Sequence, residues 1–399
     1  MKKTWINISD VLFFQEGPGV RNTQYTTEGV KLLNVANLVD GKVDLSTSDR
    51  YISEDEAYGK YKHFLCDAGD FIIASSGIKV EYIDKKMGFI DESMLPLCMN
   101  TSTIRFKVLD DNQLRIRYFM YYLKSQHFKN QLFKQITGSA QLNYGPSHLK
   151  KMIVPLINLG KQDEIIACMD KVQSIIERRQ QELVKLDTLI KARFVEMFGN
   201  IATGQYKYET RRMGEVAKVG SSHRVFTTEF VDDGIPFYRG TEIGELANGQ
   251  KPSELYYISE EHYKRLANDD TRPKVGDLLM PSICNKGQVW MVDTEEPFYY
   301  KDGRVLCISP NREIYDSRYL QYFMRVKTEV EYPKMGSGST FSEFKIFLLK
   351  DFEVLTPPRD IQEEFSSFVE QVDKSKVEVQ KALDETQQLF DSLMQQYFG

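Results

Sequence analysis

The chain repeats itself at an offset of 200 residues, and this repeat restricts the possible folds more than any other feature. Residues 138–199 align without a gap with residues 338–399. Identical pairs in this alignment include Gly138/Gly338, Leu149/Leu349, Gln162/Gln362, Leu183/Leu383 and Phe198/Phe398. A match of this length predicts two copies of one structural unit.

The repeat continues upstream at offsets of about 204 to 207, with small insertions between landmarks. Gly29 corresponds to Gly234, and Gly69-Asp70 corresponds to Gly276-Asp277. Each Gly-Asp pair leads into a short apolar run, which predicts a turn followed by a buried strand. The segments 80–99 and 288–300 show little likeness. The overall framework is therefore duplicated, but these internal segments differ between the copies.

Each copy ends in a long amphipathic segment. Apolar residues at spacings of mostly three and four predict one helix over 163–198, and Pro357-Pro358 precedes a matching helix whose stripe runs from Phe365 to Tyr397. A helix of about 36 residues is ~54 Å long, too long to bury its stripe against a small domain. We expect the two helices to pair as an antiparallel coiled coil, with docking on a partner protein as the alternative.

The remainder of each copy predicts a compact mixed α/β (α+β) module. Residues 1 to about 150 and 205 to about 350 contain short β-branched and aromatic runs, with helical stretches at 117–133 and 317–329. Tyr118-Phe119-Met120 and Tyr322-Phe323-Met324 recur on these stretches, and we expect them to pack into the cores.

Composition and motifs exclude several classes. No apolar run reaches the ~18 residues of a membrane span, and the polar start lacks a secretory signal, so we expect a cytoplasmic protein. Five widely spaced cysteines predict free, mostly buried thiols. We find no nucleophile, metal-binding or phosphate-binding motif of an enzyme, and Asp70, Glu81 and Asp84 lack a dependable metal-ligand spacing.

Local charge and loop composition favour nucleic acid. The chain has a net charge of −5, but residues 103–151 hold nine Lys or Arg against two acids, and 304–350 hold eight against five. A Gly-rich polar loop precedes each long helix, at 135–144 and 334–341. Glycine lets the backbone approach phosphates, and Gln or Asn can bond to adenine in the major groove.

Together, the repeat, the loops and the helices make the chain resemble the specificity subunit of Type I restriction-modification systems. The local motifs are Leu33-Asn34-Val35-Ala36-Asn37 followed by Asp40-Gly41-Lys42, the Gly69-Asp70 strand opening, the Gly138-Ser139 loop, and 155–162 leading into the helix. The departure is Asn158-Leu159-Gly160, where the second copy has Pro358 and charged residues. The first helix therefore begins with residues that differ from the family pattern.

The resemblance implies four parts. Residues 1–154 form target-recognition domain 1, 155–200 conserved helical spacer 1, 201–354 target-recognition domain 2, and 355–399 conserved helical spacer 2. It also implies a non-catalytic subunit that reads a bipartite, asymmetric site on double-stranded DNA. Two methyltransferase subunits would bind the helices, and motor-nuclease subunits would join them. S-adenosylmethionine, Mg²⁺ and ATP would then bind to the partners, with no cofactor on this chain.

Candidate DNA contacts lie on the polar loops and on the turns after the predicted strands. In the first copy they are Asn34, Asn37, Ser75, Ser76, Lys79, Lys134, Thr137, Ser139, Gln141, Asn143 and Lys150. In the second copy they are Arg239, Thr241, Asn285, Lys286, Gln288, Lys334, Ser337, Ser339 and Thr340. The main alternative is a scaffold that recruits proteins, not nucleic acid, on a coiled-coil stalk. A second alternative is a self-contained nuclease or methyltransferase with an unrecognised site.

Overall fold

The chain forms two compact units, of which one combines two separate segments and the other is one continuous segment. The structure is a computed structural model that describes residues 3–135, 143–267, 271–335 and 342–399. Unit 1 comprises residues 1–180 and 381–399, and unit 2 comprises residues 181–380. Each long helix therefore contributes one part to each unit. The four boundaries expected from the sequence stay predictions.

Unit 1 contains eleven named strands and most of the shorter helices of the first copy. Its strands are β1 (Thr4–Asn7), β2 (Leu12–Glu16), β3 (Val30–Leu33), β4 (Leu38–Val39), β5 (Lys42–Val43), β6 (Tyr51–Ile52), β7 (Phe71–Ala74), β8 (Met87–Phe89), β9 (Leu97–Met99), β10 (Thr103–Val108) and β11 (Ile153–Leu156). Its helices are α1 (Ile8–Val11), α2 (Glu54–Tyr58), α3 (Ile116–Lys124), α4 (Gln126–Gln135), α5 (Pro146–Leu149) and the first part of α6 (Leu159–Phe198).

The strands of unit 1 form a main antiparallel sheet and smaller sheets beside it. The main sheet has the order β2-β10-β7-β8. A second sheet has the order β6-β3-β9, in which β3 and β9 run parallel. β1 pairs with β11, which brings the chain back beside its own start before α6 begins.

Unit 2 contains the elements of the second copy. Its strands are β12 (Gly199–Asn200), β13 (Gln205–Tyr206), β14 (Thr210–Arg212), β15 (Ala217–Gly220), β16 (Phe230–Val231), β17 (Ile235–Tyr238), β18 (Tyr256–Ile258), β19 (Leu278–Pro281), β20 (Trp290–Met291), β21 (Tyr299–Tyr300), β22 (Val305–Pro310) and β23 (Glu353–Leu355). Its helices are α7 (Met213–Val216), α8 (Gly240–Ala247), α9 (Glu260–Leu266), α10 (Ser317–Glu331), α11 (Ile346–Lys350) and part of α12 (Arg359–Phe398).

The two units share one topology, as the repeat predicted. The main sheet of unit 2 has the order β15-β22-β19-β20, strand for strand the counterpart of the sheet in unit 1. β17 pairs parallel with β21 as β3 does with β9, and β14 pairs with β23 as β1 does with β11. The mixed α/β fold class is therefore confirmed.

The predicted Gly-Asp turns open the central strands of both sheets. Gly69 and Gly276 have φ of 86° and 84°, which glycine adopts most easily. The carboxylate of Asp70 accepts a hydrogen bond from the backbone N–H of Asp67 (2.9 Å), and Asp277 accepts one from Lys274 (2.9 Å). These bonds close the same turn in both copies, so β7 and β19 start in the same way.

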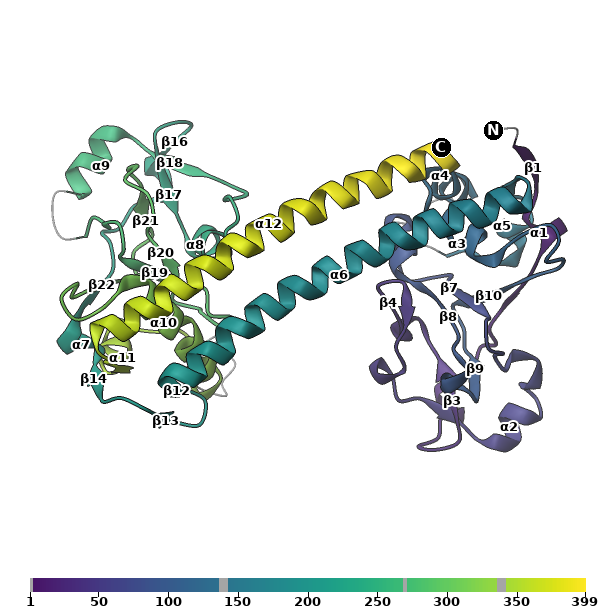
Figure 1. Ribbon diagram of the computed structural model, residues 1–399, viewed down its shortest axis with the longest axis horizontal. Coiled ribbons are helices and arrows are strands. Elements are labelled where there is room, and N and C mark those ends of the chain that lie inside the picture. Colours follow the sequence, from purple (N-terminus) through teal and green to yellow (C-terminus); the bar gives the residue numbers. More distant parts are fainter. Residues whose placement is uncertain (1–2, 136–142, 268–270, 336–341) are drawn as a thin grey trace. The chain divides into compact units, whose positions relative to one another are not determined.

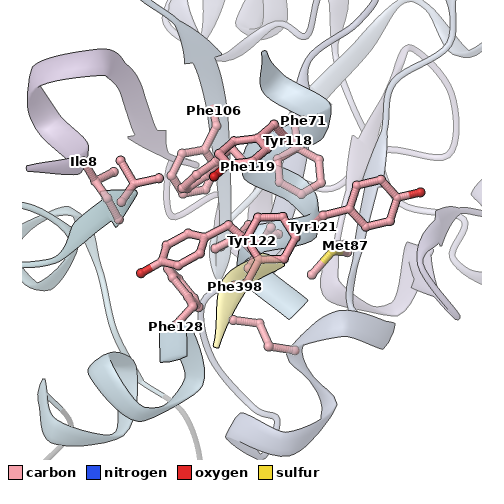
Figure 2. Close-up of a cluster of buried hydrophobic side chains, with 14 of the residues drawn as sticks. Ile8, Phe71, Met87, Phe106, Tyr118, Phe119, Tyr121, Tyr122, Phe128 and Phe398 are labelled. Atoms are coloured by element: carbon pink, nitrogen blue, oxygen red, sulfur yellow. The ribbon is translucent and has the colours of Figure 1, made fainter. Parts of the chain in front are cut away.

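Aromatic side chains fill the core of unit 1 between the main sheet, α3 and the long helices. Phe71 and Phe106 come from the sheet, whereas Tyr118 and Phe119 come from α3, and all four are fully buried. Figure 2 shows Phe398, from the last turn of α12, lying among Tyr118, Tyr122 and Phe128. The predicted core role of the Tyr-Phe-Met triplets is confirmed for Tyr118 and Phe119, and for Phe323 and Met324 in unit 2.

The long helices lie side by side and antiparallel within each unit (Figure 1). In unit 1 the Arg179 guanidinium donates hydrogen bonds to the Ala382 carbonyl and to the Thr386 hydroxyl. In unit 2 Lys376 pairs with Asp187 at 2.7 Å, and Arg193 pairs with Glu364 at 2.6 Å. The predicted pairing of the two helices is confirmed.

A buried glutamine fastens the start of each long helix to its unit. The Gln162 side chain accepts a hydrogen bond from the Arg115 N–H (2.9 Å) and donates to the carbonyls of Gln113 and Ile157. Gln362 makes the same three bonds, with the Asp316 N–H and the carbonyls of Ile314 and Pro357. The identity of these two residues in the repeat therefore has a structural cause.

Two helix predictions need correction. α6 begins at Leu159, not at 163, because the Asn158 carbonyl accepts from the N–H groups of Lys161 and Gln162. The stretch 117–133 is two helices, α3 and α4, because Ser125 adopts an extended backbone (φ −72°, ψ 152°). Its hydroxyl donates to the Tyr122 carbonyl and accepts from the Phe128 N–H, which ends one helix and caps the next.

Two other expectations can be checked within the described part of the chain. None of the helices there is both long and apolar enough to cross a membrane. All five cysteines are free, and four of them are buried; Cys168 is the partly exposed one. The predicted state of the thiols is confirmed.

Candidate DNA interface

In both units, the loop after the central strand meets the loop that precedes the last short helix. The Tyr144 N–H donates to the Ser75 carbonyl at 3.0 Å in unit 1. The Phe344 N–H donates to the Ser282 carbonyl at 2.7 Å in unit 2. Tyr144 and Phe344 correspond across the repeat, as do Ser75 and Ser282. The fold thus brings together two loops that the sequence singled out separately.

In unit 1 this meeting point is a group of polar side chains, which we call the unit 1 cluster: Glu16, Ser75, Ser76, Ser102 and Asn143. The Ser75 hydroxyl donates to Glu16 Oε1 at 3.2 Å, and the hydroxyls of Ser76 and Ser102 lie 2.6 Å apart. Ser76 and Asn143 form a β-bridge. Three predicted contacts, Ser75, Ser76 and Asn143, are therefore neighbours.

In unit 2 the corresponding place is a cleft of about 430 Å³, which we call the unit 2 cleft. It is lined by residues of α8, the end of β19 and the loops around β20 and β22: Arg239, Gly240, Thr241, Pro281, Ser282, Ile283, Gln288, Lys301 and Arg304. Three of these side chains are cations and none is an acid. Such a cleft suits an anionic or hydrogen-bond-accepting ligand.

Arg239 is held in place on one side of this cleft. Its guanidinium donates to both oxygens of Glu242 (2.7 and 3.1 Å) and to Glu254 (3.0 Å), and lies 4.1 Å from the centre of the Tyr256 ring. The bond to Glu242 is the largest of the effects that raise the pKa of Arg239 above its usual value. Two carboxylates offset its charge, so Lys301 and Arg304 are the better candidates for phosphate contacts.

Lys301 and Arg304 differ in how they are paired. Arg304 is exposed and pairs with Glu343, whose pKa is lowered chiefly by a hydrogen bond from Lys345. Lys301 forms no ion pair with any described residue. Its full charge is therefore available to a ligand in the cleft.

Two predicted contacts of unit 1 point into the protein. Asn34 and Asn37 are buried, and Asn37 Oδ1 accepts from the Asn34 N–H at 2.9 Å. The Asn37 amide donates to the Asp44 backbone carbonyl and the Thr47 hydroxyl, and Asn34 Oδ1 accepts from the Asn100 side-chain amide at 2.9 Å. Their side chains form hydrogen bonds within the turn after β3. Arg239 and Glu242 do the same in the turn after β17. Their role as DNA contacts stays a prediction.

The other predicted contacts are spread along exposed loops and helix ends. Lys79 precedes the short helical segment at 80–85, Lys134 lies near the end of α4, and Lys150 caps α5. Asn285 and Lys286 lie in the exposed loop between β19 and β20, where the Lys286 backbone N–H donates to Gln288 Oε1 and the Gln288 amide donates to Asn285 Oδ1. Lys334 pairs with Glu331. Thr137, Ser139, Gln141, Ser337, Ser339 and Thr340 lie outside the described residues.

Sequence reasoning missed five polar residues of the two sites: Glu16, Ser102, Ser282, Lys301 and Arg304. Ser282 could have been found, because it is the counterpart of Ser75 in the repeat. Lys301 and Arg304 come directly after the segment 288–300, in which the copies show little likeness. Glu16 carries the charge opposite to the one that a DNA contact suggests.

The candidate nuclease carboxylates do not form a metal site. Asp70 is buried and pairs with Arg105 (3.2 Å) and Lys107 (3.2 Å), so its charge is neutralised inside unit 1. Across the described part of the chain, no group of three His, Cys, Asp or Glu side chains is placed to hold a metal ion.

Comparison with known proteins gives one consistent family. The family model described as "Type I restriction modification DNA specificity domain" matches twice, at residues 23–186 and 206–387. The Type I restriction enzyme MjaVIII specificity subunit of Methanocaldococcus jannaschii is 23% identical over 186 residues, which cover 46% of this chain and 42% of that protein. A putative type I restriction enzyme specificity subunit of Haemophilus influenzae is 21% identical over 265 residues, 65% of this chain and 64% of that protein.

Solved structures share the fold at low sequence identity. The S subunit of a Type I restriction-modification system from M. genitalium superposes with a TM-score of 0.54 and 16% identity, over 98% of this chain and 95% of that one. A chain from a study of complex assembly and conformational transition of the type I R-M system gives 0.58 and 16%, over 99% and 97%. These likenesses support the fold.

Proposed function

This chain belongs to the Type I restriction modification DNA specificity domain family, and we propose that it reads a bipartite, asymmetric site on double-stranded DNA. Unit 1 would read one half-site and unit 2 the other. The chain would have no catalytic centre of its own. Its matched segments span about two fifths and two thirds of the relatives' lengths, so this proposal rests mainly on the sites described above.

The observation that carries the proposal is that one topology holds two chemically different polar sites. The unit 1 cluster presents hydroxyls, an amide and the Glu16 carboxylate, whereas the unit 2 cleft presents Arg239, Lys301 and Arg304. Sequence is read by hydrogen bonds to base edges, and different donors and acceptors select different bases. Because the two units share one topology but present different polar side chains, they favour recognition of two different half-sites.

The paired helices are proposed to set the gap between the half-sites. Each helix has 40 residues, which at 1.5 Å per residue is ~60 Å. Half-sites about one helical turn of DNA (~34 Å) apart face the same side of the duplex. A helix pair of this length is sufficient for such a spacing.

The same helices are proposed to bind two methyltransferase subunits, which motor-nuclease subunits then join. Leu189 and Leu389 correspond across the repeat and are exposed to 48% and 50%, so the same apolar feature occurs once in each unit. A surface present twice fits two copies of one partner. S-adenosylmethionine, Mg²⁺ and ATP are proposed to bind to these partners. The cytoplasmic location also stays a prediction.

A salt series separates DNA reading from the alternative of a protein-recruiting scaffold. Binding of a duplex through phosphate contacts should weaken steeply as salt rises, because neutralised phosphates release counterions. The complex of this chain with its cognate methyltransferase should also bind one DNA sequence far more tightly than others. Equal, salt-insensitive binding to all duplexes would favour the scaffold.

A methylation assay tests two parts of the proposal: that the chain has no catalytic centre, and that the recognised DNA site has two parts. DNA incubated with the purified chain, S-adenosylmethionine and Mg²⁺ should stay unmodified. Addition of the cognate methyltransferase should give methylated adenines at a two-part motif with an unspecified gap. Turnover by the chain alone would show that it is itself an enzyme.

A further inference from the structure

We propose that Glu16 is a specificity-determining residue of unit 1 that accepts a hydrogen bond from the exocyclic amino group of a cytosine or an adenine. This inference rests on the proposed function and names the chemistry of one contact within it. Glu16 is the last residue of β2, and its backbone pairs with Ile104 at the edge of the unit 1 cluster.

Among the described residues, the Glu16 carboxylate has a hydrogen-bond partner on one of its two oxygens. Oε1 accepts from the Ser75 hydroxyl at 3.2 Å. Oε2 accepts no hydrogen bond from a described residue. This oxygen is not buried, so it reaches solvent. A Cβ placed on Gly145 would lie 3.1 Å from Oε2, so the carboxylate lies against the turn that opens α5.

Within the described residues, no ion pair neutralises the charge of Glu16. No Lys or Arg among the described residues pairs with it, in contrast to Asp70, which has both Arg105 and Lys107. A carboxylate beside Ser75, Ser76 and Asn143 would repel DNA phosphates. Its presence there is compatible with DNA binding if the free oxygen meets a hydrogen-bond donor on a base.

The major groove offers such donors as the N4 amino group of cytosine and the N6 amino group of adenine. Guanine and thymine present carbonyl oxygens at the corresponding edge, which a carboxylate repels. Glu16 would therefore distinguish amino bases from keto bases on one strand.

The second copy shows that the carboxylate is not required by the frame. The counterpart of Glu16 is Ser221, which follows β15. Its hydroxyl donates to the Val305 carbonyl (2.7 Å) and accepts from the Gly303 N–H (2.9 Å), so it closes a local turn. The side chain at this position therefore bonds to the backbone in unit 2, whereas in unit 1 it presents a solvent-accessible carboxylate oxygen.

The test maps methylated adenines in genomic DNA treated with the cognate methyltransferase and either wild-type chain, Glu16→Ala or Glu16→Gln. Wild type should require an amino base at one position of one half-site. Glu16→Ala should lose at least about tenfold discrimination there, and Glu16→Gln, whose amide also donates, should admit guanine or thymine. Ser221→Ala should leave this half-site unchanged.

The outcomes separate this inference from the proposed function. A wild-type complex without a two-part motif would contradict the proposed function itself. A two-part wild-type motif that Glu16→Ala and Glu16→Gln both reproduce with equal stringency would overturn the role of Glu16. Glu16→Gln keeps the shape of the side chain and the acceptor for Ser75. If Glu16→Ala does not fold, the motif of Glu16→Gln therefore tests the role of Glu16. The position at which the Glu16 variants lose discrimination also identifies the base: a C·G pair in the wild-type motif means that Glu16 reads cytosine, and an A·T pair means that it reads adenine.

Discussion

At the scale of single residues, Gln162 gives a sharp test of how the long helix is attached. Gln162→Ala removes three buried hydrogen bonds and leaves one backbone N–H and two carbonyls without partners. We expect unit 1 to lose about 2–4 kcal/mol in its free energy of unfolding, measured by urea denaturation. Gln180→Ala on the same helix is the control, since Gln180 is exposed and also repeats as Gln380. Equal stabilities of the two variants would refute the fastening role.

Lys301 is the residue at which the phosphate contact of unit 2 can be measured. Lys301→Ala removes a cation of the unit 2 cleft that has no ion pair with a described residue. DNA affinity should fall for all sequences alike, and the slope of log affinity against log salt should flatten by about one unit. Lys264→Ala on α9, where Lys264 pairs with Glu260, is the control and should leave the slope unchanged. A change of preferred sequence without a change of slope would assign Lys301 to base reading.

Single residues are also where prediction from the sequence reached its limit. Ser75, Ser76 and Asn143 were predicted on separate loops and lie together. Asn37 was predicted from the same kind of reasoning, yet its amide is fully used inside the turn after β3. The direction of a short polar side chain depends on partners that come from distant parts of the chain, and the residue type alone does not fix it.

At the scale of elements, Leu189 and Leu389 test the proposed docking of two partner copies. A charge on an apolar contact between helices is costly, so Leu189→Lys and Leu389→Lys should each reduce the number of bound methyltransferases from two to one. Native mass spectrometry counts the subunits directly. Val184→Lys is the control, because the counterpart of Val184 is Asp384 and a surface used twice would not contain it. Retention of two copies by both leucine variants would place the docking surface elsewhere.

The elements were predicted better than the residues because their signals are periodic or repeated. The apolar spacing identified both long helices, and the Gly-Asp turns identified β7 and β19. The break between α3 and α4 was missed, because Ser125 acts through its own backbone-capping bonds within a run of helix-forming residues. The parallel pairs β3-β9 and β17-β21 were also not predicted, since they join strands far apart in sequence.

At the scale of the whole molecule, the duplication explains how one chain presents two different polar sites on the same framework. The frame residues that close turns and fasten helices are kept in both copies, as Asp70/Asp277 and Gln162/Gln362 show. The residues that line the two sites differ, as Glu16 and Ser221 show. The net charge of −5 is compatible with DNA binding if the proposed partner subunits supply part of the phosphate contacts. The resemblance to Type I specificity subunits was apparent from the order of motifs, and family membership confirms it.

The most direct test of two independent readers is an exchange of residues 205–350 for those of a relative, followed by mapping of methylated adenines. This segment holds the unit 2 cleft, which is proposed to read one half-site, and the exchange leaves both long helices intact. We predict that one half-site changes, while the other half-site and the length of the gap stay as in the parent. A change in both half-sites would contradict the account.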